Sequence, residues 1–232
     1  IDKLSKSGIT FLNGYASSAN CAPSRATMMS GKYNPSHGIY TVSPSERGLD
    51  ITRKIIPVKN TENLSLDFFT IAEMLKSKGY VNAHVGKWHL GEKGHYPKDQ
   101  GFDVNIGGWE SGGPRGGYFS PYSNPNLENG PDGEYLTDRL TEEAINFIND
   151  NKDSKFFLHL AYYSVHTPIQ SKKEFSNYFK NKPSDKNHNI ADYAGKIPSL
   201  DENVGKQLSK IEELNLTENT IIIFTSDNGG IR

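Results

Sequence analysis

The chain has one cysteine, and the residues that follow it give it a chemical setting. Cys21 begins the run Cys21-Ala22-Pro23-Ser24-Arg25, which continues through small residues to Gly31. Proline is favoured in the first turn of a helix and glycine just after the last, so a helix is predicted to start at Cys21 and to stop at Gly31. Free N–H groups at this start attract anions, and Arg25 adds a permanent planar cation one turn further on. The run is suited to binding a tetrahedral oxyanion.

Two interpretations of Cys21 by itself are open. A thiol beside a helix start and an arginine has a low pKa, and it could be a reactive nucleophile of protease or phosphatase type. An unpaired cysteine is also often a small apolar residue of the core. Local residue types do not decide between the two.

A second segment places a lysine and a histidine at the end of a predicted strand. Thr70 and Glu73 have the spacing of a capping box, so a helix is expected from residue 71 to about residue 78. Apolar side chains then alternate over residues 81–85, which predicts a strand. Lys87 and His89 follow two positions apart, and in extended geometry they would share a face. Either residue alone could equally be a solvated loop residue.

Two apolar runs predict strands that are covered on both faces of a parallel sheet. The first begins at Phe156 and is followed by His166-Thr167-Pro168, and the second covers residues 220–225. His159 lies inside the first run, and we expect it to be a structural histidine of the core. Asp227 and Asn228 follow the second run. Hard oxygen donors at a tight turn suit Ca²⁺ or Mg²⁺, although Asp-Asn-Gly is also an ordinary turn sequence.

These segments, in this order, resemble the signatures of one enzyme family. Cys-x-Pro-Ser-Arg before a small-residue helix resembles the first signature of the type I sulfatases, which depend on formylglycine and belong to the alkaline phosphatase superfamily. The strand that ends in Gly86-Lys87-Trp88-His89 resembles the second signature. Later parts of the family pattern are similar to the segments around His166, Leu200-Asp201-Glu202-Asn203 and Asp227-Asn228-Gly229. In the last helix, Asp201 is expected to be a helix cap and not a metal ligand.

The resemblance implies a modified residue and a metal ion. Cys21 would be oxidised after synthesis to formylglycine by a formylglycine-generating enzyme or an anaerobic sulfatase-maturating enzyme. Modified Cys21, Asp227 and Asn228 would be ligands of Ca²⁺, with Mg²⁺ as the alternative. The family also has paired aspartates upstream of the cysteine motif and a lysine downstream of the Asp-Asn-Gly turn, and this chain contains neither. Calcium takes about six to eight oxygens, so we expect this chain alone to bind the metal weakly and not to turn over substrate.

The resemblance also implies a role for each basic residue. One hydroxyl of the hydrated aldehyde would attack sulphur, with Arg25 and Lys87 neutralising the sulfate oxygens. His166 would contact the substrate and protonate the departing oxygen. His89 would help the second hydroxyl to lose its proton, which expels sulfate. The glycine content of residues 107–133 predicts a loop. Its sequence resembles that of arylsulfatases, so Arg115 and the aromatic residues of the loop are expected at the rim of the substrate site. The alternative is a surface loop that does not pack against the site.

The order of the predicted elements indicates the fold class. Strands near residues 8–12, 81–85, from 156 to before 166, and 220–225 alternate with helices near 136–148, 172–179 and 190–214. Such alternation predicts an α/β/α sandwich with a mostly parallel sheet, and active residues then gather at the carboxyl ends of its strands. The resemblance implies the alkaline phosphatase and sulfatase architecture. It also implies that residues 1–232 are part of the N-terminal catalytic domain, without its first strand and the C-terminal subdomain.

Composition narrows the classes of protein. At 232 residues and 34% hydrophobic content the chain can bury a core. A net charge of −1 gives no polycationic patch for nucleic acid, and no apolar stretch is long enough to span a membrane. The family resemblance, and not composition, implies a sulfuric ester hydrolase that acts on a sulfated small molecule or carbohydrate and is periplasmic or secreted. The alternatives are a phosphodiesterase or phosphonate monoester hydrolase of the same superfamily, and a catalytically inactive sulfoglycan-binding protein.

Overall fold

The computed structural model describes residues 1–183 and 189–230, and it is built around a short parallel sheet. The strand order is β2-β1-β3, with β1 at Val81–Gly86, β2 at Val104–Ile106 and β3 at Phe156–Ala161. β1 pairs with β3 over its whole length, from Val81 opposite Phe156 to Gly86 opposite Ala161. Because all three strands are parallel, their carboxyl ends lie at one edge of the sheet.

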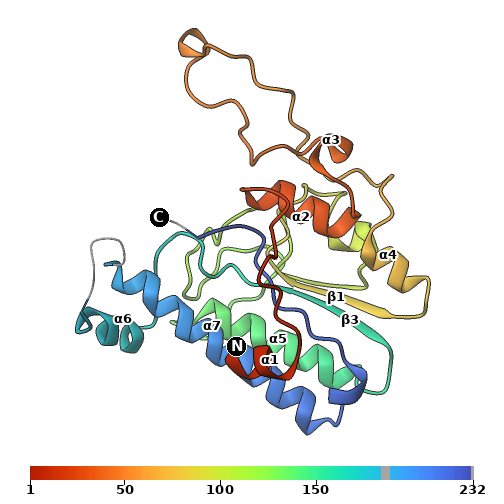
Figure 1. Ribbon diagram of the computed structural model, residues 1–232, viewed down its shortest axis with the longest axis vertical. Coiled ribbons are helices and arrows are strands. Elements are labelled where there is room, and N and C mark those ends of the chain that lie inside the picture. The colour runs from red at the N-terminus through yellow and green to blue at the C-terminus, as the bar shows by residue number, and fades with distance from the viewer. Residues whose placement is uncertain (184–188, 231–232) are drawn as a thin grey trace.

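Helices lie on both faces of this sheet (Figure 1). Helices α2 and α4 lie on one side, and the long helices α5 and α7 lie on the other. The α-helices are α1 (Asp2–Ser7), α2 (Cys21–Ser30), α3 (Asn34–His37), α4 (Ile71–Lys76), α5 (Leu136–Asp150), α6 (Lys173–Lys180) and α7 (Ala191–Glu213). Short 3₁₀ helices cover Asp50–Thr52, Pro97–Gln100 and Thr217–Asn219. The predicted α/β fold with a parallel sheet is confirmed.

Local signals in the sequence account for the ends of two helices beside the site. Helix α2 begins at Cys21, and Gly31 ends it in the left-handed conformation, with φ of 65° and its N–H bonded to the Thr27 carbonyl at 2.8 Å. Helix α4 has the predicted capping box, because Glu73 N–H donates to Thr70 Oγ1 at 3.2 Å and Thr70 N–H donates to Glu73 Oε2 at 2.8 Å. Both ends agree with the sequence.

Two apolar clusters fill the space between the layers. One packs α2 and α4 around Trp88, which is completely buried, together with Leu64, Leu90 and Phe102. The other packs α5 against the sheet through Val85, Tyr118, Tyr122, Leu136 and Leu140. Trp88 and the residues next to it follow directly after β1, so the core holds the segment that leaves the carboxyl end of this strand.

Two predicted strands are absent from the described residues. Residues 8–12 are irregular and follow the short helix α1, and residues 220–225 make no strand ladder. Apolar β-favouring residues stay exposed in both segments, for example Phe11 at 80% and Ile221 at 90%. β-Propensity favours an extended backbone, but a strand also needs a neighbouring edge and cover on its faces. Neither segment has them here, so these two predictions are wrong.

Two further predictions about burial and capping need correction. β3 forms as expected, but Phe156 to Leu160 are only half-buried, because β3 lies at the edge of the described sheet. Asp201 lies inside α7 and does not cap it, since this helix continues from Ala191 through the whole predicted segment.

Candidate active site

Cys21 is half-buried at the first residue of α2, and basic groups from two other segments, Lys87 and His89 after β1 and His166 after β3, act on it. Burial alone would raise the pKa of its thiol. Hydrogen bonds from His166 and His89, together with the charge of Lys87, outweigh burial and lower this pKa to about 5. Position 21 is therefore built to hold a negative charge at neutral pH, and Cys21 is not an inert residue of the core.

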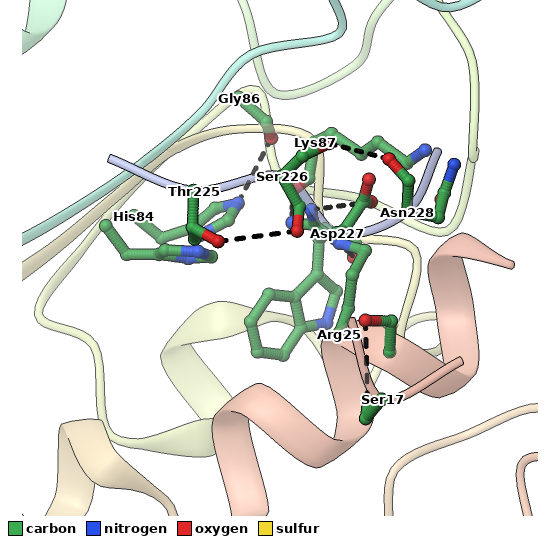
Figure 2. Close-up of polar contacts among 12 residues, drawn as sticks. Ser17, Arg25, His84, Gly86, Lys87, Thr225, Ser226, Asp227 and Asn228 are labelled. Atoms are coloured by element: carbon green, nitrogen blue, oxygen red, sulfur yellow. Dashed lines mark hydrogen bonds and ion pairs between the residues drawn. The ribbon is translucent and has the colours of Figure 1, made fainter. Parts of the chain in front are cut away.

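Arg25 connects α2 to the end of β1. Its guanidinium is buried, with Nε donating to the Trp88 carbonyl at 2.7 Å and Nη2 donating to the Lys87 carbonyl. Nη1 lies 3.5 Å from the Asp227 carboxylate, as Figure 2 shows. Burial lowers the pKa of Arg25, and Asp227 and Cys21 oppose that shift. The planar fork thus fixes the backbone of the Lys87 segment and presents a cation beside position 21.

Lys87 follows β1 directly and is held by the neighbouring strand. Its backbone N–H donates to the Ala161 carbonyl of β3 at 2.8 Å, and its side chain is 4% exposed. Burial and the nearby Arg25 lower the pKa of Lys87, while Cys21 and Asp227 raise it. A lysine so close to an arginine is stabilised when an anion lies between the two cations.

His89 also lies near Cys21, but its backbone does not have the extended conformation that the sequence predicted. The extended geometry expected for Lys87 and His89 is wrong, because His89 has φ of 61° and β1 already ends at Gly86. The His89 N–H donates to the Trp109 carbonyl at 3.0 Å. Within the described part of the chain, the buried Nδ1 of His89 has no hydrogen-bond partner. An unpaired buried nitrogen beside an anionic position suits contact with a bound molecule.

His166 approaches Cys21 from the loop that follows β3. Its N–H donates to the Tyr163 carbonyl at 2.8 Å, and its Nδ1 lies 2.8 Å from the Thr167 carbonyl. A carbonyl only accepts, so Nδ1 carries the proton of this bond. Nε2 is then the nitrogen left for Cys21 or a substrate. By contrast, His159 lies within β3 and pairs with buried His84 at 3.0 Å between their Nδ1 atoms, which agrees with a structural role.

The glycine-rich loop 107–133 packs against both site histidines. A Cβ on Gly112 would overlap the His89 ring, and one on Gly113 would lie 3.3 Å from the His166 ring. The Arg115 guanidinium is exposed and lies 4.9 Å from the centre of the Trp109 ring. Three aromatic side chains of the loop are buried, so an unpacked surface loop is excluded for them: Trp109, Tyr118 and Tyr122.

Asp227 and Asn228 lie on the turn beside Arg25 and Lys87 (Figure 2). Asp227 is half-buried and offers a carboxylate, and the Asn228 amide nitrogen donates to the Gly229 carbonyl at 2.8 Å, which leaves its side-chain oxygen uncommitted by that bond. These hard oxygen donors suit Ca²⁺ or Mg²⁺. No group of three or more His, Cys, Asp and Glu side chains gathers as a metal site in residues 1–183 and 189–230. The donors fit such an ion as part of a larger ligand set.

Comparison with known proteins decides the family. The family model described as Sulfatase matches residues 1–232. The chain belongs to the sulfatase family. It is 30% identical over 254 residues to the N-acetylgalactosamine-6-sulfatase of Mus musculus, covering 99% of this chain and 45% of that protein. It is 32% identical over 250 residues to the arylsulfatase of Hemicentrotus pulcherrimus, covering 99% of this chain and 42% of that protein.

Solved structures agree with this membership. The crystal structure of Ps i-CgsB in complex with k-i-k-neocarrahexaose matches with a TM-score of 0.72 and 28% identity. The match covers 94% of this chain and 50% of the other. This sulfatase chain therefore spans about half the length of the curated relatives it matches. No helix among the described residues is long and apolar enough to cross a membrane.

Sequence patterns missed the residues that support the site from a distance. Gly112 and Gly113 make room for the two imidazoles, and the Trp88 carbonyl anchors Arg25. Lys196 of α7 donates a hydrogen bond to the backbone carbonyl of His166. Only the glycine content of the loop gave a signal for this group, because the contacts join residues far apart in the chain.

Proposed function

We propose that this chain is the part of a sulfatase that carries the reacting residue, and that the complete protein hydrolyses sulfate esters through formylglycine made from Cys21. The observation that supports this most is the convergence of Lys87, His89 and His166 on position 21, which lowers the pKa of the thiol to about 5. A site that stabilises a thiolate there also stabilises an oxyanion at the same position.

Formylglycine at position 21 would supply, in its hydrated form, one hydroxyl for attack on sulphur and a second hydroxyl for the release of sulfate. Arg25 and Lys87 bind and orient the sulfate group, because both are buried cations beside this position. Each charge-assisted hydrogen bond to a sulfate oxygen would contribute about 1.5–3 kcal/mol. The two cations also spread the negative charge that grows on the oxygens during transfer.

The two histidines move protons in this proposal. The Thr167 carbonyl holds the proton on Nδ1 of His166, so Nε2 is the atom that donates a proton to the departing alcohol oxygen. His89 is placed to accept the proton of the second hydroxyl. His89 lowers the pKa of Cys21, so it acts beside the reacting residue, and Gly112 leaves room for its ring.

Residue 21, Asp227 and Asn228 would hold Ca²⁺, or Mg²⁺ in its place. The ion would supply positive charge beside the nucleophile. The Asp227 carboxylate already faces Arg25 of α2. It would therefore bind the metal while its contact with Arg25 keeps the turn next to α2. A formylglycine-generating enzyme or an anaerobic sulfatase-maturating enzyme would be the partner that modifies Cys21. The periplasmic or secreted location stays a prediction.

Sulfated carbohydrate is the proposed substrate class. The support is similarity to a protein named N-acetylgalactosamine-6-sulfatase, and to a structure solved with a neocarrahexaose at 28% identity. Arg115 would lie at the rim, where its exposed guanidinium rests on Trp109, and the Trp109 carbonyl binds the backbone of His89. An exposed cation held by an aromatic ring suits a sulfated sugar.

The test is a parallel assay of sulfate and phosphate esters with the complete, matured protein. We expect hydrolysis of sulfate esters, much weaker hydrolysis of matched phosphate mono- and diesters, and loss of activity in Cys21→Ala. The matched control is Ser30→Ala at the other end of α2, where the hydroxyl bonds the Ala26 carbonyl of the same helix, and this variant should stay active. Preference for phosphate esters, or unchanged activity in Cys21→Ala, would contradict the proposal.

A further inference from the structure

Lys196 is a completely buried cation of α7 that the proposed reaction does not use. In the part of the chain that the structure describes, no carboxylate forms an ion pair with it. Burial lowers the pKa of its ammonium group to about 7. A buried charge without an opposite charge is costly unless all its donors are used. Packing alone therefore does not explain why a lysine occupies this buried position.

The contacts of Lys196 supply that reason. Its Nζ donates to the His166 carbonyl at 2.5 Å and to the Pro168 carbonyl at 3.2 Å. The same atom lies 3.5 Å from the centre of the Tyr118 ring. An ammonium group has three N–H donors and no acceptor, so two carbonyls and one aromatic face account for all three.

The neighbouring glycine brings α7 close enough for these contacts. A Cβ on Gly195 would lie 2.7 Å from Ser171 Oγ and 3.2 Å from the Phe175 Cβ. Ser171 lies just beyond the loop that carries His166, and Ser171 Oγ also bonds Asp192 of α7 at 3.0 Å. Because residue 195 has no side chain, α7 packs closely against Ser171. The side chain of Lys196, the next residue, then reaches the loop that carries His166.

These contacts act on the orientation of the His166 ring. The carbonyls of His166 and Pro168 accept from Lys196, and the carbonyl between them, that of Thr167, accepts from Nδ1 of His166. Fixing the two outer carbonyls limits the rotation of the Thr167 peptide. Tyr118 also holds this loop, because its single hydroxyl proton is shared between the carbonyls of Tyr163, at 2.6 Å, and His166, at 3.0 Å.

We propose that Lys196 is a positioning residue that holds the 166–168 backbone so that Nε2 of His166 faces the departing oxygen of the substrate. This inference rests on the proposed role of His166 as the proton donor. Lys196 itself does not touch the substrate. A misplacement of the imidazole by about 1 Å would cost on the order of 10²-fold in rate.

The test compares Lys196→Met with wild type in the complete, matured protein, using one sulfate ester with a good leaving group and one with a poor one. Methionine keeps the length of the side chain but donates no hydrogen bond. We expect kcat for an alkyl or sugar sulfate to fall by roughly 10–100-fold and kcat for 4-nitrophenyl sulfate to fall by less than about threefold, with KM little changed, because only a poor leaving group needs its proton. Lys206→Met, at an exposed position of the same helix, is the matched control and should leave both rates unchanged.

A double-mutant cycle separates failure of this inference from failure of the proposed function. In a His166→Ala background, Lys196→Met should cause no further loss, because both changes remove one interaction. Equal losses for both substrates, or a full additional loss in that background, would overturn the role of Lys196. If His166→Ala alone shows no dependence on the leaving group, the proposed acid role of His166 fails instead. Should Lys196→Met not fold, Lys196→Gln, which keeps two N–H donors, enters the same cycle with the same expected pattern in weaker form, and equal losses there would likewise overturn the inference.

Discussion

At the scale of single residues, the site is a cluster of cations that stabilises negative charge at position 21. Burial lowers the pKa of both Lys87 and Arg25, and the charge of Arg25 lowers that of Lys87 further, so Asp227 alone leaves a cost that negative charge at position 21 reduces. A thiolate, an oxyanion or a sulfate group relieves that cost. Stabilisation of negative charge by these buried cations therefore explains both the low pKa of Cys21 and the proposed chemistry.

The pKa of Cys21 gives a prediction for the unmodified protein. Because the folded thiol has a pKa of about 5 and an ordinary thiol has one near 8.5, the thiolate should already be complete above about pH 6. The alkylation rate with iodoacetamide should rise with pH through about 5 and stay level from about pH 6 to 8. Lys87→Met should move the midpoint upward, since it removes a positive charge. A rate that still rises between about pH 7 and 9 in wild type would contradict this account.

Arg25 gives a prediction about stability. Arg25→Lys keeps the charge but loses the fork that binds the Trp88 and Lys87 carbonyls, and it leaves buried acceptors unpaired. The free energy of unfolding should fall by about 3 kcal/mol, measured by urea denaturation. The control is Arg47→Lys at an exposed loop position, which should change that free energy by less than about 0.5 kcal/mol. Similar values for the two variants would show that the fork does not stabilise the fold.

At the scale of elements, the site depends on how loops meet the carboxyl ends of β1 and β3. Lys87 and His89 leave β1, His166 follows β3, and the glycine-rich loop covers both histidines. Parallel strands that pair in register bring these loops to one edge of the sheet. The glycine-rich loop then fixes the positions of the His89 and His166 rings by packing against them.

Gly112 tests that packing. Gly112→Ala places a methyl group in steric overlap with the His89 ring, so the ring or the loop must move. We expect kcat for sulfate esters to fall by roughly 10²-fold, with a smaller change in KM. Gly205→Ala on α7 is the control, because its Cβ meets no atom within 4 Å, and it should raise stability by about 0.5–1 kcal/mol without loss of activity. Wild-type kcat in Gly112→Ala would show that the loop does not position His89.

Sequence patterns predicted the elements whose signals are local and missed those that need distant partners. Gly31 and the Thr70–Glu73 capping box gave correct helix ends, because each acts within one helical turn. The apolar runs at 8–12 and 220–225 did not form strands, since pairing depends on an edge elsewhere in the molecule. For the same reason the supporting contacts of Lys196 left no local pattern, and Gly112 was indicated only by the glycine content of its loop, whereas the motif residues that surround Cys21 could be named in advance.

At the scale of the whole molecule, the chain covers about half of its curated relatives, and we propose that it holds only some of the ligands of the metal ion. Asp227 and Asn228 with residue 21 provide fewer than the roughly six to eight oxygens that Ca²⁺ takes. We expect isothermal titration to show much weaker Ca²⁺ binding by residues 1–232 than by the complete protein, by at least about tenfold. Asp227→Asn in the complete protein should weaken binding as well. Equally tight binding by residues 1–232 would mean that the described donors suffice.

The measurement that tests the central claim most directly is mass spectrometry of the peptide that contains residue 21, taken from the complete and catalytically active protein. The account predicts formylglycine at this position, in a fraction that follows the specific activity of each preparation. Full activity with an unmodified Cys21 thiol would contradict it.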